Sequence, residues 1–172
     1  MHTSFTGVWV PIITPFEPGD PTSIDHAALA RLAQHLAGQG ISGLVVGATT
    51  GEGILLQPGE QEALLATLRA AVPQLPLVMG LSSASTHDAV QRARALSPLQ
   101  PEGLLVTPPL YVRPSQEGIR RHVEAVTESA DLPVLVYNIP YRTGCQVELE
   151  TLQQLAQDPR VVGLKECGGS QE

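Results

Sequence analysis

Six short apolar runs, separated by longer amphipathic stretches, are the feature that most constrains how this chain can fold. The runs cover residues 7–14, 41–47, 77–81, 103–107, 133–137 and 161–165. Nearly every residue within them is apolar, whereas a strand with one face in water would alternate apolar and polar side chains. Because parallel strands are usually covered on both faces, the pattern predicts six parallel strands, one about every 26–36 residues.

The stretches between these runs have the apolar spacing of helices and cover residues 25–39, 58–71, 86–96, 115–129 and 148–157. Side chains that commonly cap helices precede three of them: Asp25 or Ser23, Ser85 or Thr86, and Ser115. Pro58, followed by Glu60 and Glu62, marks the start of another. Strict alternation of strands and helices predicts an α/β chain with a parallel sheet covered by helices.

Two architectures fit this alternation, an open doubly wound sheet and a (β/α)8 TIM barrel. A dinucleotide-binding sheet would carry G-x-G-x-x-G directly after its first strand, but that run leads into Thr14-Pro15-Phe16. A phosphate-binding G-x-x-x-x-G-K-[ST] motif is also absent from the sequence. We therefore expect a TIM barrel, which needs eight strands and about 250 residues. Residues 1–172 would form the N-terminal three-quarters of this single domain, truncated before strands seven and eight.

Composition narrows the function classes. The chain carries 10 basic and 17 acidic residues, for a net charge of −7, which argues against a nucleic-acid surface. It has neither a secretory signal nor the roughly 18 consecutive apolar residues of a spanning helix. Two cysteines, Cys145 and Cys167, cannot frame a disulfide scaffold and suit a reducing cytoplasm, so we expect a cytoplasmic protein. The five histidines show neither H-E-x-x-H spacing nor cysteine pairing, which argues against a metal site.

Polar residues gather where the predicted strands end, which is where a barrel places its catalytic groups. The second strand leads into the turn Thr49-Thr50-Gly51-Glu52, whose hydroxyls and backbone amides suit a small carboxylate. The same turn also fits an ordinary connection between a strand and a helix. Arg142, shortly after the fifth strand, has the geometry to bind a substrate carboxylate through two hydrogen bonds, or it is a solvated loop residue.

Lys165 ends the sixth strand in a chain that has very few lysines. Either its stem packs while its ammonium reaches solvent or pairs with Glu166, or the amine is a Schiff-base nucleophile. Tyr137 ends the preceding strand, 28 residues earlier. Adjacent strands lie about 4.8 Å apart, so the two side chains can meet, and a phenol beside a reacting amine can relay protons. An ordinary core tyrosine is the alternative.

Four segments together resemble a known family: residues 47–52 (GATTGE), 107–118 (TPPLYVRPSQEG), 137–144 (YNIPYRTG) and 163–166 (GLKE). In this order and spacing the sequence resembles dihydrodipicolinate synthases, which belong to the N-acetylneuraminate lyase superfamily of class I aldolases. The resemblance extends from about Phe5 to the last residue.

The resemblance implies a role for each of seven residues. Lys165 is similar to the lysine that forms an imine with pyruvate, and Tyr137 to the tyrosine that shuttles protons. Thr49 and Tyr111 would complete this relay, with Tyr111 reaching into the site of a neighbouring subunit. The remaining three would bind substrate: Thr50 and Gly51 the pyruvate carboxylate, and Arg142 the carboxylate of the aldehyde.

The activity implied is the condensation of pyruvate with L-aspartate 4-semialdehyde to 4-hydroxy-tetrahydrodipicolinate, a step of lysine and diaminopimelate biosynthesis. The protonated imine serves as electron sink, so no cofactor or metal is expected. The full-length enzyme would be a homodimer or homotetramer, with neither nucleic acid nor membrane as partner. Two alternatives stay open: a related aldolase or dehydratase acting on a 2-keto-3-deoxy sugar acid or sialic acid, and a non-catalytic fragment or binding module that keeps the fold.

Some positions depart from the family pattern. Gly53 replaces the usual serine after T-T-G-E, Tyr141 replaces a serine common before R-T-G, and Gly168 stands where threonine is frequent. The latter two leave the aldehyde substrate open. At the positions aligned with the lysine-binding site of feedback-inhibited synthases, three residues replace a histidine, an asparagine and a tyrosine: Pro58, Ala84 and Leu110. We therefore expect no feedback inhibition by lysine.

Overall fold

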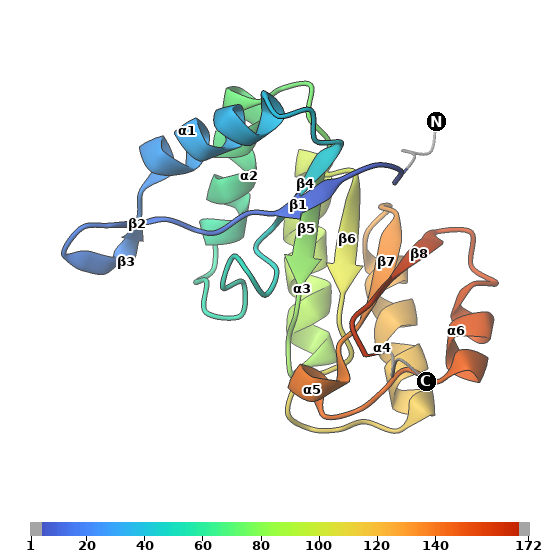
Figure 1. Ribbon diagram of the computed structural model, residues 1–172. Coiled ribbons are helices and arrows are strands. Elements are labelled where there is room, and N and C mark those ends of the chain that lie inside the picture. The colour runs from blue at the N-terminus through green and yellow to red at the C-terminus, as the bar shows by residue number, and fades with distance from the viewer. Residues whose placement is uncertain (1–4, 169–172) are drawn as a thin grey trace. The chain divides into compact units, whose positions relative to one another are not determined.

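Strands and helices alternate along the chain in the computed structural model, as the apolar runs predict (Figure 1). The structure describes residues 5–168. The chain divides into two compact units, residues 1–80 and residues 81–172. Each of the six predicted strands is present. Three lie in each unit, except that Leu81, the last residue of the third strand, belongs to the second unit. The α/β prediction is confirmed, whereas the predicted extent of the domain stays a prediction.

The first unit contains three parallel strands, β1 (Trp9–Pro11), β4 (Gly43–Val46) and β5 (Leu77–Leu81), whose last residue belongs to the second unit. Strand β4 pairs with both of the others, Trp9 aligning with Gly43 and Leu44 with Leu77. Helices α1 (His26–Ala37) and α2 (Glu60–Ala71) lie side by side (Figure 1). Every residue of β4 is buried, as expected for a strand covered on both faces.

A small antiparallel hairpin in this unit was not predicted. It consists of β2 (Phe16–Glu17) and β3 (Asp20–Ile24), joined through Gly19 at a φ of +86°. Four of the five residues of β3 are exposed. A strand this polar lacks the apolar run on which the prediction of the other strands depends.

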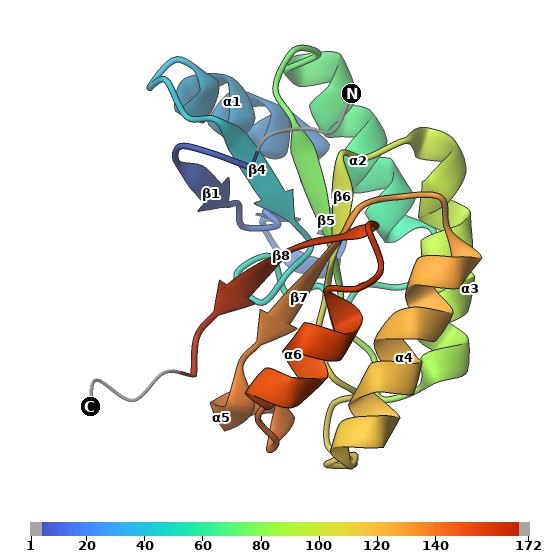
Figure 2. The ribbon, with the colours of Figure 1, turned by 90° about the vertical axis from the view of Figure 1, so that its right-hand side faces the viewer.

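The second unit contains the parallel strands β6 (Gly103–Val106), β7 (Val134–Asn138) and β8 (Val161–Glu166), with β7 in the middle. Three helices lie side by side along them, α3 (Thr86–Leu96), α4 (Gln116–Ser129) and α6 (Leu149–Leu155) (Figure 2). Two short elements complete the unit, the 3-10 turn η1 (Ser97–Leu99) and helix α5 (Pro140–Thr143). Of the helices described, none is long and apolar enough to cross a membrane.

Local capping explains where several helices begin. The side chains of Asp25, Ser85 and Ser115 each accept a hydrogen bond from the amide three residues ahead. The caps are therefore Asp25 rather than Ser23, Ser85 rather than Thr86, and Ser115 as predicted. Helix α2 starts later than predicted, at Glu60, because Gly59 before it has a φ of +87° that is left-handed rather than helical.

Candidate active site

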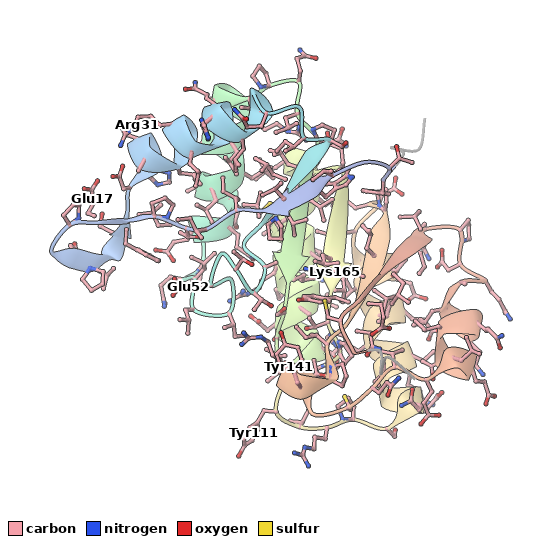
Figure 3. All side chains as sticks on the ribbon, in the orientation of Figure 1. Glu17, Arg31, Glu52, Tyr111, Tyr141 and Lys165 are labelled. Carbon is pink, nitrogen blue, oxygen red and sulfur yellow. The ribbon has the colours of Figure 1, made fainter. Side chains whose placement is uncertain are left out.

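Lys165 and Tyr137 form a pair in the second unit. They occupy neighbouring strands, β8 and β7, and align with each other in the register of these strands. The Lys165 Nζ lies 4.2 Å from the centre of the Tyr137 ring, and Tyr137 is only 3% exposed. The lysine itself is half-buried on the β8 strand (Figure 3). The predicted meeting of these two side chains is confirmed. We call them the reacting pair, after the role that we propose for them under Proposed function. Lys165 is the only lysine among the 172 residues.

Glu166 is engaged elsewhere and does not pair with Lys165. Its carboxylate accepts hydrogen bonds from Asn138 Nδ2 at 2.9 and 3.1 Å and from the amide of Gly168. Successive side chains of a strand point to opposite faces, so Glu166 and Lys165 point apart. Among the ion pairs of residues 5–168, none joins Lys165 to Glu166. The ion-pair alternative considered for Lys165 is therefore wrong.

Arg142 lies on α5, directly after β7. The four-residue helix is closed by Gly144, at a φ of +75°, and by the Thr143 hydroxyl, which donates to the carbonyl of Cys145 at 2.8 Å. The guanidinium carbon of Arg142 lies 5.4 Å from the centre of the Tyr141 ring, and both residues are exposed. A guanidinium that is stacked on one face keeps its N–H donors available at its edge, where a carboxylate binds.

Tyr111 is not brought to the reacting pair. It lies in the loop between β6 and α4, is 90% exposed, and points away from Lys165 in the same unit (Figure 3). Two non-glycine residues of this loop, Tyr111 and Arg113, have φ values of +70° and +46°. Such conformations are uncommon for residues other than glycine. Its predicted role in a neighbouring subunit stays a prediction.

Thr49, Thr50 and Gly51 belong to the first unit, in the turn that follows β4. The Thr14 hydroxyl donates to the carbonyl of Gly51 at 2.7 Å, and the amide of Gly53 donates to the carbonyl of Ala48 at 3.1 Å. These bonds fix the turn, with Thr49 half-buried and Thr50 exposed. Their meeting with the reacting pair stays a prediction. The hydrogen bond of Thr14 to this turn was not predicted, although Thr14 is the polar end of an apolar run.

Close backbone packing explains why glycine replaces serine at position 53. A Cβ atom on Gly53 would lie 1.6 Å from the carbonyl oxygen of Gly47, and one on Gly80 would lie 2.5 Å from the same atom. Gln61, buried on α2, donates to the Gly80 carbonyl at 2.8 Å. This chain therefore folds the turn more tightly than a serine at position 53 permits.

His122, on α4, is the buried titratable group that sequence reasoning left without a role. It is 1% exposed, and its Nδ1 lies 2.9 Å from the hydroxyl of Thr86. Burial lowers the pKa of His122 to about 4, against a smaller opposing effect of the Thr107 backbone. The imidazole is consequently neutral at physiological pH and ties α4 to α3.

A hollow of about 550 Å³ lies away from Lys165 and Tyr137, between α4 and the segment leading into β8. Its lining includes Glu124, Glu128, Arg160 and Val161. Val161 is the first residue of β8 and Lys165 the fifth, so the hollow lies at the opposite end of the strand from the reacting pair. Within the described range, histidine, cysteine and acidic side chains form no group of three or more that could hold a metal ion.

Comparison with known proteins decides the family. The chain matches the Dihydrodipicolinate synthetase family over residues 4–172. The chain belongs to this family. The 4-hydroxy-tetrahydrodipicolinate synthase of Synechococcus sp. (strain WH7803) is 39% identical over 172 residues, 99% of this chain and 56% of that protein.

Solved structures of dihydrodipicolinate synthases have the same fold. The enzyme of Methylacidiphilum fumariolicum SolV superposes with a TM-score of 0.91 at 36% identity, covering 97% of this chain and 55% of that one. The enzyme of Cyanidioschyzon merolae, solved with lysine bound, has a TM-score of 0.91 at 34% identity. The match covers 97% of this chain and 57% of that one. The chain thus spans little more than half the length of these relatives. Its α/β repeats correspond to those of the family.

Proposed function

We propose that the protein is a 4-hydroxy-tetrahydrodipicolinate synthase that condenses pyruvate with L-aspartate 4-semialdehyde through an imine on Lys165. The observation that carries the proposal is the reacting pair, with the Lys165 Nζ 4.2 Å from the centre of the Tyr137 ring. Family membership supports the same chemistry. The amine sits at the end of an apolar strand, and within residues 5–168 it forms no ion pair with Glu166, so no neighbouring carboxylate competes with the ketone for it.

The steps balance without an external oxidant or reductant. The Lys165 amine adds to the ketone carbon of pyruvate, and water leaves to give a protonated imine. Loss of a proton from the pyruvate methyl group gives an enamine, which attacks the aldehyde carbon and forms the new carbon–carbon bond. The substrate's own amine then displaces Lys165, closing the ring and freeing the enzyme. The imine is the electron sink throughout, so we propose that neither a metal nor an organic cofactor takes part.

The other site residues take roles in substrate binding and proton transfer under this proposal. The Tyr137 hydroxyl moves protons during formation of the imine, in a relay with Thr49 and with Tyr111 of a neighbouring copy. The hydroxyl of Thr50 and the backbone of Gly51 bind the carboxylate of pyruvate. The outward position of Tyr111 supports a homodimer or homotetramer. Under the same proposal the enzyme acts in the cytoplasm, with small molecules as its substrates.

Chemical trapping tests the proposal. The full-length protein is incubated with pyruvate and borohydride, which reduces an imine to a stable amine, and the modified peptide is identified by mass spectrometry. We expect one reduced pyruvate adduct on Lys165 and none in Lys165→Ala. Tyr137→Phe is the matched control, because it keeps the amine but removes the hydroxyl, and it should label more slowly. Labelling that continues unchanged in Lys165→Ala would contradict the proposal.

Steady-state turnover then identifies the aldehyde. We expect product from pyruvate and L-aspartate 4-semialdehyde, and no cleavage of sialic acid or of a 2-keto-3-deoxy sugar acid. If the imine is trapped on Lys165 but only a sugar acid is turned over, the proposed lysine chemistry stands and the proposed aldehyde substrate is wrong.

A further inference from the structure

Asn138 follows Tyr137 on β7 and forms the next step of the strand pairing. It aligns with Glu166, just as Tyr137 aligns with Lys165. Because side chains alternate along a strand, the reacting pair occupies one face and Asn138 with Glu166 the other. Asn138 is 1% exposed, so each of its polar atoms needs a partner within the protein.

The polar groups of Asn138 hold three segments together. Its Nδ2 donates to both carboxylate oxygens of Glu166, at 2.9 and 3.1 Å. Its Oδ1 accepts from the amide of Val147 at 3.0 Å, and its main-chain carbonyl accepts from the amide of Cys167 at 2.8 Å. One buried residue therefore joins β7 to the end of β8 and to the segment that follows α5.

The bond to Glu166 bears on the reacting pair through position. Glu166 follows Lys165 on β8, and Asn138 fixes its carboxylate on the face of the strand opposite Lys165. The same bond fixes the main chain of β8 one residue beyond Lys165, and thereby the direction in which the lysine leaves the strand.

The bond to Val147 bears on the segment that carries Arg142. Val147 is 2% exposed and follows the end of α5 by only a few residues. Anchoring its amide to β7 fixes the return of the chain from α5. The hydrogen bonds of Asn138 thus fix both the end of β8, which carries Lys165, and the turn that carries Arg142.

We propose that Asn138 is a positioning residue for the imine-forming step: its amide anchors Glu166 and thereby aligns the end of β8, which carries Lys165, with the segment after α5. This assignment rests on the function proposed above. It goes beyond that function because Asn138 lies on the face of β7 opposite Tyr137 and acts through the residues that it holds in place.

The test reverses the direction of the hydrogen bond. Asn138→Asp keeps the shape and the acceptor for Val147 but places a carboxylate against Glu166. The double variant N138D/E166Q restores the bond with donor and acceptor exchanged, because the amide introduced at position 166 then donates to the carboxylate introduced at position 138. Gln153→Glu is the matched control, since it makes the same amide-to-carboxylate change at an exposed position of α6. Each full-length protein is assayed for the rate of borohydride-trapped labelling, for kcat and KM with pyruvate, and for its melting temperature.

We expect Asn138→Asp to label at least tenfold more slowly, with kcat reduced and the KM for pyruvate within threefold of wild type. The double variant should recover to within threefold of wild type, and the control should match wild type. Wild-type labelling rates in Asn138→Asp, or a double variant as slow as the single one, would overturn the assignment. If the single variant does not fold, the double variant decides alone: near-wild-type labelling supports the assignment and a tenfold loss overturns it. No labelling of the wild type would overturn the proposed function and the role of Asn138 with it.

Discussion

At the scale of single residues, Arg142 is the group whose role can be separated most cleanly from the imine chemistry. Its exposed guanidinium is stacked near the Tyr141 ring and presents N–H donors at its edge. If it binds the carboxylate of the aldehyde, Arg142→Ala should raise the KM for that substrate about ten- to 150-fold, which corresponds to a lost charged hydrogen bond of about 1.5–3 kcal/mol. The KM for pyruvate should stay within about threefold of wild type.

Steady-state kinetics with each substrate varied in turn measures both constants for Arg142→Ala. Arg31→Ala, which removes an exposed arginine from α1, serves as the control for loss of a surface charge. Equal increases of both KM values in Arg142→Ala would indicate a general structural role for α5 instead.

At the scale of elements, sequence reasoning succeeded where local chemistry decides and failed where it does not. Helix α3 and strand β5 have their predicted bounds, because a capping serine or a fully apolar run fixes them locally. The hairpin of β2 and β3 was missed because its strands are short and polar, and α5 because four residues around Pro140 read as a loop.

In the site, the register of neighbouring strand ends predicts the reacting pair. The hydrogen bonds of Asn138 were not predicted, because they need the alternation of faces and partners that lie far along the chain.

His122 makes the contact between α3 and α4 sensitive to acid. Its pKa of about 4 in the folded protein lies below the 6.5 of an ordinary histidine, so the unfolded chain binds the proton more readily. The stability contributed by the neutral imidazole is present above pH 6.5 and is lost as the pH falls towards 4. Between pH 7 and pH 5 this loss amounts to about 2 kcal/mol. His122→Gln should therefore show a smaller decrease of melting temperature over this interval than wild type.

Thermal unfolding of the full-length protein at several pH values between 7 and 5 measures this difference. His87→Gln is the control, because His87 is exposed on the neighbouring helix α3 and should leave the pH dependence as in wild type. Parallel curves for wild type and His122→Gln would show that the buried imidazole does not govern acid sensitivity.

At the scale of the whole molecule, the expected absence of inhibition by lysine depends on residues that are far apart in the sequence. A relative of known structure, from Cyanidioschyzon merolae, was solved with lysine bound. The resemblance to feedback-inhibited synthases implies that three residues stand here in place of a histidine, an asparagine and a tyrosine of the lysine site: Pro58, Ala84 and Leu110. A ligand with an ammonium, a carboxylate and an α-amine loses its polar partners at such positions, and two lost charge-assisted contacts cost about 3–6 kcal/mol.

This cost weakens binding at least about a hundredfold, so millimolar lysine should leave the full-length enzyme essentially uninhibited. Initial rates with both substrates near their KM values, measured over a lysine series from micromolar to millimolar concentrations, test this expectation. Ala84→Asn returns one polar group to the site and should bring the inhibition midpoint down relative to wild type. A wild-type inhibition curve with a sub-millimolar midpoint would contradict the prediction, and would mean that side chains other than these three satisfy the charges of lysine.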